Sequence, residues 1–437
     1  MRQYKDSGIE WIGKIPENWD ICYLKCKALI ERGGSPRPIE DYISDYGYNW
    51  IKIGDTIKGN KYITSVRQKI RKEGLNKTRL VHSGDLILTN SMSFGEPYIL
   101  QVDGCIHDGW VAISNLNKID KVFLYYLLLS PFCQYQFKLQ VAGGVVQNLN
   151  VDKIAVTYIL CPPLLEQQCI ADYLDEKCGE TDSLIALQEQ MIEKLKAYKQ
   201  SIITEAITKG LNPNAKLVPS GIDWIGNIPE GWEINKLFNL CTIKGRVGWK
   251  GLRSDEFKEN SYAYLVTGQD FVSSDINWNN CYQIDKDRYE EDPYIQLSNG
   301  DILVTKDGTI GKIAKVSGMD KPACLNSGIF VLKQRKETFF QNYLYWYLSS
   351  PLLLRYNTFI NTGGTTIIHL YQNVFERFPM IIPPMDEQIT IATYLDGKCS
   401  EIDNLIALKQ QKIEKLMDYK KSVIYESVTG KTDLKDI

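Results

Sequence analysis

The chain has 437 residues, and its 51 Lys and Arg residues against 53 Asp and Glu residues give a formal net charge of −2. This length predicts two or three domains, and the balanced charge excludes a generally cationic surface, so any binding of nucleic acid would have to be local. No apolar run approaches the roughly 20 residues of a membrane helix, and the polar start "MRQYKDSG" has no signal-peptide core, so we expect a cytoplasmic protein without membrane contact.

The cysteines and histidines indicate no metal chemistry. The 11 cysteines contain no C-x-x-C pair, and the histidines are His82, His107 and His369. This pattern fits neither a disulfide framework nor a zinc site. We therefore predict reduced cysteines, structural histidines and no metal site.

A repeated phrase begins each half of the chain. "WIGKIPENW" at 11–19 returns as "WIGNIPEGW" at 224–232, and 10 of 13 residues agree between 7–19 and 220–232. Its tryptophans and proline predict a small apolar clasp. The repeat indicates two related units in one chain.

The first unit contains a basic run and a glycine-rich loop. Between positions 58 and 79 the basic residues are Lys58, Lys61, Arg67, Lys69, Arg71, Lys72, Lys77 and Arg79. Such a run could bind phosphates or could simply be a solvated face. The loop "ERGGSPRP" at 31–38 adds Arg32 and Arg37 as candidate contacts to nucleic acid.

Two further segments of the first unit are rich in small hydrogen-bonding residues. "TNSMSFGEP", from Thr89, contains Ser91 and Ser93 and could form either a β-turn or a loop that faces a groove of nucleic acid. "AGGVVQN" at 142–148 contains Gln147 and Asn148, whose amides suit adenine edges.

A helical block follows the double proline at 162–163. "LLEQQCIADYLDEKC" has helical spacing, and after Gly179 we predict a second, longer helix with Thr181 or Asp182 as its N-cap. The apolar stripe of this second helix is Ile185, Ile192, Leu195, Tyr198 and Ile202.

The second unit has corresponding loops with different side chains. "KGRVGWKGLR" at 244–253 supplies Lys244, Arg246, Trp249, Lys250 and Arg253. "TKDGTIGK" at 305–312 supplies Lys306, Thr309 and Lys312, and "TGGTTII" at 362–368 supplies Thr365 and Thr366. Similar loops with different side chains are typical of two readers of different sequences.

A second helical block begins at Pro383, and 27 of the 46 positions from 162 to 207 recur 221 positions later. Its stripe is Ile406, Ile413, Leu416, Tyr419 and Val423. Each stripe could pack on its own domain, but the stripes agree while the neighbouring units differ, so we predict an antiparallel coiled coil. Residues 182–208 would form a rod of roughly 40 Å, close to the roughly 34–36 Å of one DNA turn.

We predict no catalytic residues. The nearest string to the N-P-P-[FY] motif of adenine methyltransferases is "NPNA" at 212–215, and "GKT" at 430–432 lacks the first glycine of a Walker A loop. The E-x-K string at 256–258 has no convincing partner aspartate.

The order of two dissimilar units, each followed by a near-identical helical block, together with "WIGxIPExW" and "PPxxEQxxIAxYLD", resembles the specificity subunit of type I restriction-modification enzymes. The resemblance implies an α+β fold: two mixed α/β target recognition domains with curved sheets, separated by long helical regions that pair with pseudo-two-fold symmetry. It implies domain boundaries of 1–160, 161–210, 211–381 and 382–437.

The resemblance also implies partners. These are double-stranded DNA, read as a split asymmetric site, two modification (methyltransferase) subunits, and restriction (translocase and nuclease) subunits. S-adenosylmethionine, ATP and Mg would belong to those subunits, and this chain would bind no cofactor. Two alternatives are a helical scaffold for protein partners, whose binding to DNA would lack steep salt dependence, and a stand-alone methyltransferase, which would bind cofactor by itself.

Overall fold

The computed structural model describes residues 2–57, 59–91, 94–142, 148–246, 251–272, 274–335, 339–360 and 369–432. The chain divides into two compact units. Unit 1 comprises 1–190 and 409–437, and unit 2 comprises 191–408, so each unit contains part of both long helices. Within the described ranges, no helix is long and apolar enough to cross a membrane.

Unit 1 is built around two five-stranded sheets. The first has the order β4-β13-β10-β11-β7 and the second β5-β8-β6-β12-β9. Neighbouring strands are antiparallel except for two parallel pairs, β7 with β11 and β6 with β12. The strands are β1 Tyr4–Asp6, β2 Lys14–Pro16, β3 Asp20–Tyr23, β4 Leu29–Arg32, β5 Ile43–Ser44, β6 Tyr48–Ile51, β7 Tyr62–Ile63, β8 Lys69–Ile70, β9 Arg79–Val81, β10 Leu86–Thr89, β11 Pro97–Leu100, β12 Gly104–Ile106, β13 Trp110–Ser114 and β14 Tyr158–Cys161.

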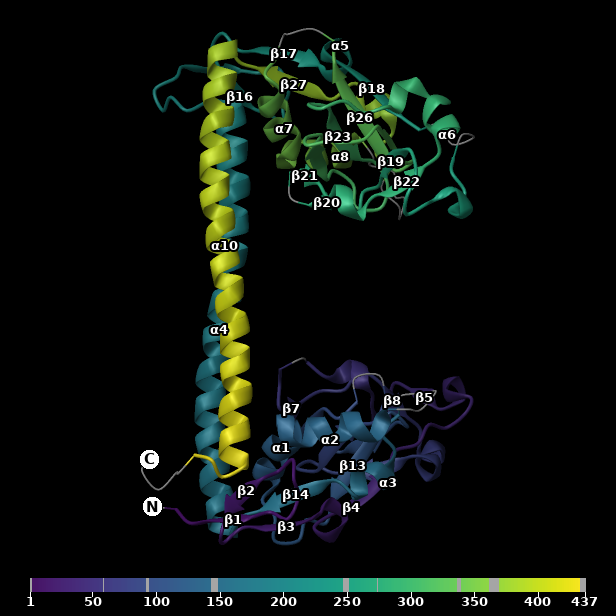
Figure 1. Ribbon diagram of the computed structural model, residues 1–437, viewed down its shortest axis with the longest axis vertical. Helices are drawn as coiled ribbons and strands as arrows, with labels where there is room; N and C mark the ends of the chain where they lie inside the picture. Colours follow the sequence, from purple (N-terminus) through teal and green to yellow (C-terminus); the bar gives the residue numbers. More distant parts are fainter. Residues whose placement is uncertain are drawn as a thin grey trace. The chain divides into compact units, whose positions relative to one another are not determined.

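Helices cover one face of the first sheet of unit 1, and the second sheet covers the other (Figure 1). Leu86 of β10 packs in the same core cluster as Phe123 of α1. The next residue, Ile87, packs on the opposite side with Ile51 of the second sheet. Burial of both faces explains why β10 is a continuous apolar run. The helices are α1 Lys121–Leu129, α2 Pro131–Val141 and α3 Val151–Ala155.

Unit 2 repeats this plan. Its two larger sheets have the orders β18-β26-β23-β24 and β22-β19-β25, and β19 and β25 are parallel, as β6 and β12 are in unit 1. The strands are β15 Leu217–Pro219, β16 Asn227–Pro229, β17 Glu233–Lys236, β18 Cys241–Gly245, β19 Ala263–Val266, β20 Phe271–Val272, β21 Asp275–Ile276, β22 Tyr282–Ile284, β23 Ile302–Thr305, β24 Ile313–Lys315, β25 Ala323–Leu325, β26 Ile329–Gln334 and β27 Pro379–Ile382. The helices are α5 Leu237–Leu240, α6 Lys286–Glu290, α7 Gln341–Ser349, α8 Pro351–Ile360 and α9 Gln372–Phe375.

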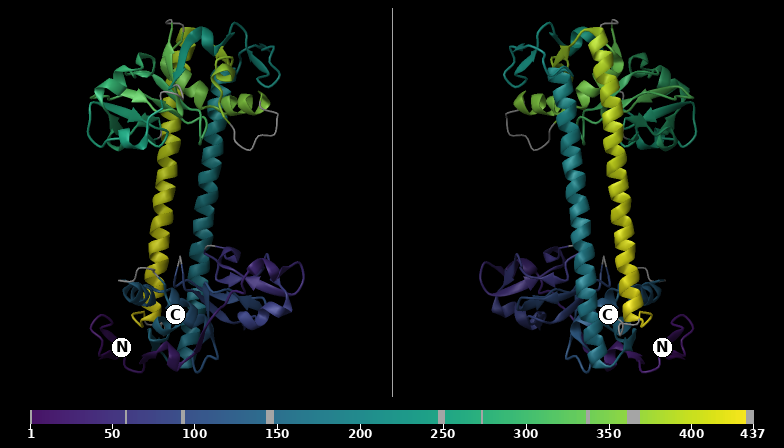
Figure 2. Two further views of the ribbon diagram at one scale, coloured as in Figure 1. Left: turned by 90° about the vertical axis from the view of Figure 1, so that its right-hand side faces the viewer. Right: turned by 90° about the vertical axis from the view of Figure 1, so that its left-hand side faces the viewer.

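The two long helices are α4, Leu164–Lys209, and α10, Met385–Val428. In each unit they lie side by side (Figure 1, Figure 2). Lys420 pairs with Asp182 at 2.6 Å in unit 1, and Lys199 pairs with Asp403 at 2.7 Å in unit 2. A low number on one helix meets a high number on the other, so the predicted antiparallel helix pair is confirmed.

One detail of the predicted helices is wrong. The chain does not start a new helix after Gly179, because α4 is continuous from Leu164 to Lys209. Thr181 is buried inside the helix, and its hydroxyl donates to the Lys177 carbonyl oxygen at 2.7 Å instead of capping a new N-terminus. A helical glycine costs only about 1 kcal/mol relative to alanine, which the packing of the helix offsets.

The predicted stripes are buried or half-buried except at their tyrosines. Ile192 and Ile413 are 6% and 5% exposed, whereas Tyr198 and Tyr419 are 58% and 52% exposed. A tyrosine six residues after the central isoleucine lies about 120° away from it around a helix of 3.6 residues per turn. Both tyrosines therefore lie beside the contact between the helices.

Candidate nucleic-acid interface

In unit 1, four loops and Asn148 meet around two cavities. Three of the loops follow β4, β6 and β10, and the fourth joins β12 to β13. One cavity, of about 580 Å³, is lined by Ser35, Pro36, Arg37, Pro38, Ile39, Glu40, Ile43, Trp50, Lys52, Gln68 and His107. The other, of about 510 Å³, is lined by Arg32, Lys52, Ile53, Gly54, Asn90, Ser91, His107, Asp108, Gly109 and Asn148. We call these residues the unit 1 loop site; the two cavities share Lys52 and His107.

The structure brings together four of the predicted contacts at this site: Arg32, Arg37, Ser91 and Asn148. Arg32 and Arg37 are exposed and both approach Asp108, with Arg32 Nε donating to its carbonyl oxygen at 3.4 Å and Arg37 lying 3.6 Å from its carboxylate. Burial would raise the pKa of Asp108, but the hydrogen bond from Ser35 and nearby positive charge outweigh it and lower that pKa. The ionised carboxylate of Asp108 therefore holds Arg37 near the cavities, and the backbone carbonyl oxygen of Asp108 holds Arg32 there.

Two asparagines at the site have unsatisfied oxygens. Oδ1 of Asn90 and Oδ1 of Asn148 are buried and accept no hydrogen bond from the described residues. The Asn90 amide nitrogen donates to the Asp108 carbonyl oxygen at 2.9 Å. Buried amide oxygens that accept no hydrogen bond are costly. A ligand or water that donates hydrogen bonds to these two oxygens would therefore be favoured at the site.

The same backbone frame recurs in unit 2. Asn90 N–H donates to the Gly109 carbonyl oxygen at 3.0 Å, and Lys306 N–H donates to that of Gly328 at 2.9 Å. The Asn90 carbonyl oxygen accepts from Leu149, as the Lys306 carbonyl oxygen accepts from Leu370. These bonds define equivalent positions in the two units.

The side chains at the equivalent positions differ. The pairs are Lys52 and Thr267, Asn90 and Lys306, Ser91 and Asp307, Glu96 and Lys312, His107 and Asn326, Asp108 and Ser327, and Asn148 and His369. In unit 2 the Lys306 ammonium lies 5.0 Å from the centre of the Phe330 ring, and His369 Nδ1 lies 2.5 Å from the Asp307 carboxylate. A shared frame therefore presents two different chemical surfaces.

The basic run of unit 1 is dispersed over several elements. Lys61 is 13% exposed and pairs with Asp175 of α4 at 2.5 Å, which is a structural contact between the sheet domain and the helix. Arg79 pairs with Glu31 at 3.0 Å, and Lys77 donates to the Tyr42 hydroxyl at 2.8 Å. The exposed members without these contacts are Arg67, Lys69, Arg71 and Lys72.

In unit 2, Arg246 is not presented to a ligand. It takes the position of Gly33 in unit 1, is 2% exposed, and donates from Nε to the Leu325 carbonyl oxygen at 2.9 Å. Arg253, Thr309 and Lys312 are exposed, while Lys244 and Lys306 are half-buried. Seven predicted contacts lie outside the described residues: Lys58, Ser93, Gln147, Trp249, Lys250, Thr365 and Thr366.

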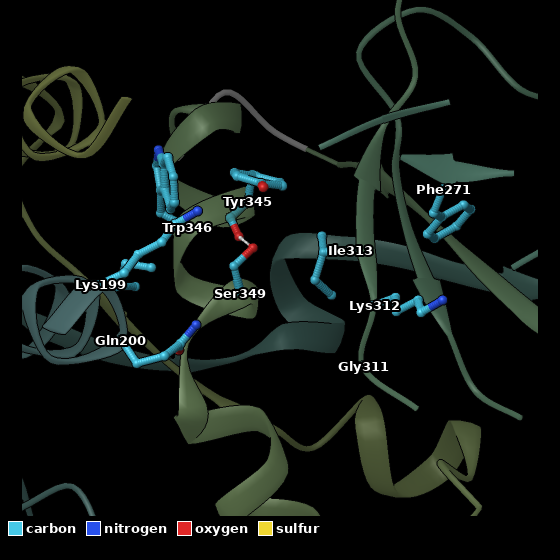
Figure 3. A pocket seen from close by; sticks show the side chains of 10 residues that line it. Lys199, Gln200, Phe271, Gly311, Lys312, Ile313, Tyr345, Trp346 and Ser349 are labelled. Atoms are coloured by element: carbon cyan, nitrogen blue, oxygen red, sulfur yellow. Dashed lines mark hydrogen bonds between the residues drawn. The ribbon is translucent and has the colours of Figure 1, made fainter. Parts of the chain in front are cut away.

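Unit 2 also has a cavity of about 350 Å³ between α4 and the end of the 305–312 loop (Figure 3). Tyr345, Trp346 and Ser349 of α7 form one wall, and Ser349 donates to the Tyr345 carbonyl oxygen at 2.8 Å. Lys199, on the α4 side of the cavity, is paired with Asp403. Figure 3 shows the Lys312 side chain directed away from Lys199. The two lysines do not converge on one anion.

The repeated motifs attach each unit to its helices. Gln167 Oε1 accepts from Asp120 N–H, and Gln388 Oε1 accepts from Phe340 N–H, both at 2.7 Å. The "YLD" aspartates do the same for aromatic side chains, because Tyr126 donates to Asp175 and Trp346 donates to Asp396. The motif residues thus fix the sheet domain on the helix and do not face the loop site.

The "WIGxIPExW" clasp packs at helix C-termini. A Cβ on Gly430, after α10, would meet Trp19 at 3.1 Å, and a Cβ on Gly210, after α4, would meet Trp232 at 3.1 Å. Both glycines have positive φ, as residues that end helices commonly do. The clasp is therefore part of the frame in both units.

Sequence reasoning missed Lys52, Asn90, His107 and Asp108. The signal for Asn90 was its place directly after the apolar strand β10, and the signal for His107 was its place after the apolar "GCI" of β12. Among the described residues, no cluster of His, Cys, Asp and Glu is suited to hold a metal ion.

Comparison with known proteins agrees with this architecture. The family model described as type I restriction modification DNA specificity domain matches residues 16–197 and again 229–417. The type I restriction enzyme MjaVIII specificity subunit of Methanocaldococcus jannaschii is 26% identical over 100% of this chain and 99% of its own length. The EcoBI specificity subunit of Escherichia coli is 25% identical over 80% of this chain and 72% of its own length.

Solved structures share the fold. A chain from a structure on complex assembly and conformational transition of the type I R-M system has a TM-score of 0.72 and 17% identity, and the match covers 96% of this chain and 99% of the other. The HsdS subunit from Thermoanaerobacter tengcongensis has a TM-score of 0.50 and 15% identity, with 96% and 98% covered.

Proposed function

The chain belongs to the family of type I restriction modification DNA specificity proteins, and we propose that it is a non-catalytic subunit that reads a bipartite DNA site in the cytoplasm. Each unit would read one half-site. The observation that carries this proposal is that units 1 and 2 share one backbone frame and differ at its loop side chains. A frame shared by two different surfaces suits two readers of different sequences.

The chemistry of the loop sites fits duplex DNA. Arg32 and Arg37 in unit 1, and Lys306 and Lys312 in unit 2, would contact phosphates or guanine edges. The amide, hydroxyl and imidazole groups beside them would supply sequence selectivity. Arg246 and Lys61 are left out of this interface because their side chains are held by internal partners.

The helices offer two equivalent docking surfaces for partner subunits. In unit 1, Leu184, Leu187 and Tyr419 are 44%, 46% and 52% exposed. The residues 221 positions away from them in unit 2, Leu405, Leu408 and Tyr198, are 47%, 60% and 58% exposed. Exposed apolar side chains repeated in this way indicate binding sites for two copies of one partner. We propose that two modification subunits bind here and carry S-adenosylmethionine, with restriction subunits carrying ATP and Mg.

The helical regions would set the distance between the half-sites. We propose recognition domains at 1–160 and 211–381 with helical spacers at 161–210 and 382–437. Deleting one helical turn within 184–206 should then change the preferred gap between half-sites and leave both half-sites unchanged. Changed half-sites with an unchanged gap would refute the spacer role.

A domain exchange tests the assignment of one unit to one half-site. Residues 20–160 would be replaced by the matching segment of another family member, and the chain would be co-expressed with its modification subunit. Single-molecule sequencing of host DNA should show a methylated motif altered in one half only. Alteration of both halves would refute the assignment, and a wild-type complex that methylates no motif would refute the proposed function.

A further inference from the structure

His107 is one of the two residues that line both cavities of the unit 1 loop site, and its side chain is 19% exposed. Lys52 is the other shared residue, and its ammonium donates to Gln68 Oε1 at 2.7 Å. The polar group of Lys52 therefore already has an internal partner.

Two neighbours, Gly109 and Trp50, restrain the imidazole ring. Gly109 N–H donates to His107 Nδ1 at 2.7 Å. A Cβ on Gly109 would lie 2.2 Å from His107 Cε1, so the ring occupies the space that a side chain at 109 would need. Trp50 meets the ring edge-on, with ring centres 6.1 Å apart. The ring cannot turn freely, and its polar atoms have defined roles.

The hydrogen bond from Gly109 determines those roles. Nδ1 must be unprotonated to accept it, so Nε2 carries the proton of the neutral ring and is a donor. Burial lowers the pKa of His107 below its ordinary value near 6.5, with Lys52 lowering it further and Asp108 and Asp55 opposing. His107 is therefore an uncharged donor at neutral pH, which suits a base edge better than a phosphate.

We propose that His107 is a specificity-determining residue of unit 1, whose Nε2–H donates to an acceptor on the major-groove edge of one base in the first half-site. The acceptors available there are purine N7, guanine O6 and thymine O4, whereas cytosine presents a donor. His107 accordingly rejects cytosine at the contacted position. This inference rests on the proposed function and adds a residue and a base preference to it.

Unit 2 has a different residue, Asn326, at the backbone position that His107 occupies in unit 1. His107 N–H donates to the Ile51 carbonyl oxygen, and Asn326 N–H donates to the equivalent Val266 carbonyl oxygen. Both residues directly follow the strand that pairs in parallel, β12 or β25, and precede the equivalent glycines by two positions. Asn326 is half-buried, so the position is accessible in both units while its side chain differs.

The test compares methylation motifs of the co-expressed complex. His107→Ala should admit cytosine at one position of the first half-site and reduce discrimination there roughly 10- to 100-fold, the effect expected for one lost base contact. The second half-site should be unchanged, which shows that the chain is folded and assembled. His82→Ala removes a 76% exposed histidine that lines neither cavity, and it should leave the motif intact.

A second variant tests the placement of the ring. Gly109→Ala should displace the imidazole and weaken discrimination at the same base position. The inference is overturned if His107→Ala leaves the first half-site unchanged, or if it weakens every position of both half-sites equally. In either case the proposed function stands if the wild-type complex methylates a bipartite motif. A wild-type complex that methylates no motif would refute the proposed function and with it the basis of the inference.

Discussion

The loop sites of the two units share a backbone frame but not side chains, whereas the helices beside them share side chains as well. At the loops, the backbone hydrogen bonds agree between units while the side chains differ, as at Asn90 and Lys306. On the helices, the side chains themselves recur, as in the ion pairs Asp182–Lys420 and Lys199–Asp403. Backbone bonds can hold a loop whatever side chains it carries, whereas helix pairing and docking depend on the side chains. The side chains of the loops can therefore change without altering the frame.

The strongest test of this contrast is removal of the frame tryptophans. Trp19 is fully buried and Trp232 is 8% exposed. Replacing either with alanine should lower the free energy of unfolding of its own unit by roughly 3–5 kcal/mol, the usual cost of deleting a buried large aromatic side chain. Urea titration measures the loss, and hydrogen exchange should place it in unit 1 for Trp19→Ala and in unit 2 for Trp232→Ala.

Trp11 provides the matched control, because it belongs to the same repeated phrase but is 41% exposed. Trp11→Ala should cost less than about 1 kcal/mol, as surface substitutions usually do. If Trp19→Ala were as mild as Trp11→Ala, the clasp would not be part of the frame.

The next largest expected effect is on the discrimination between bases that we propose for unit 2. Lys306→Asn places the residue of unit 1 in the frame of unit 2, and it removes an ammonium held over Phe330. It should weaken discrimination in the second half-site by about 1–3 kcal/mol and leave the first half-site unchanged. Binding of duplex DNA by the assembled complex, compared across single-base variants of the site, measures this.

Lys286→Asn controls for loss of a positive charge, because Lys286 is 59% exposed and pairs with Glu290 on α6. It should leave both half-sites as they are. A Lys306→Asn complex with wild-type discrimination at every position would show that the frame position does not read DNA.

The sequence predicted the frame better than the side chains that gather at the loop sites. Repeated motifs and apolar stripes report burial, so the paired helices and the clasp were predictable. The continuity of α4 through Gly179 was not predictable, because packing against α10 overrides the local cost of glycine. A glycine-rich string pointed to the loop of Arg32 and Arg37, which lies at the unit 1 loop site. A basic residue such as Lys61 can equally pair with a distant acid, and only the fold reveals Asp175 beside it.

His107 illustrates the same limit. In the sequence it is one histidine among three with no motif around it. Its position depends on the parallel pairing of β12 with β6 and on the backbone of Gly109, contacts that no local pattern encodes.

The smallest expected effect is the pH dependence that His107 gives to unit 1. Because its pKa is lowered below its ordinary value near 6.5, the unfolded chain binds more protons than the native one in the window below pH 6.5. Stability therefore rises with pH through that window, is fully present above it, and is lost as the pH falls toward the folded pKa. His107→Asn should flatten this slope in urea titrations between about pH 5 and 7.5. His82→Asn, which removes an imidazole outside both cavities, should leave the slope as in the wild type, and equal slopes for the wild type and His107→Asn would show that the ring is not held in the neutral form that donates from Nε2.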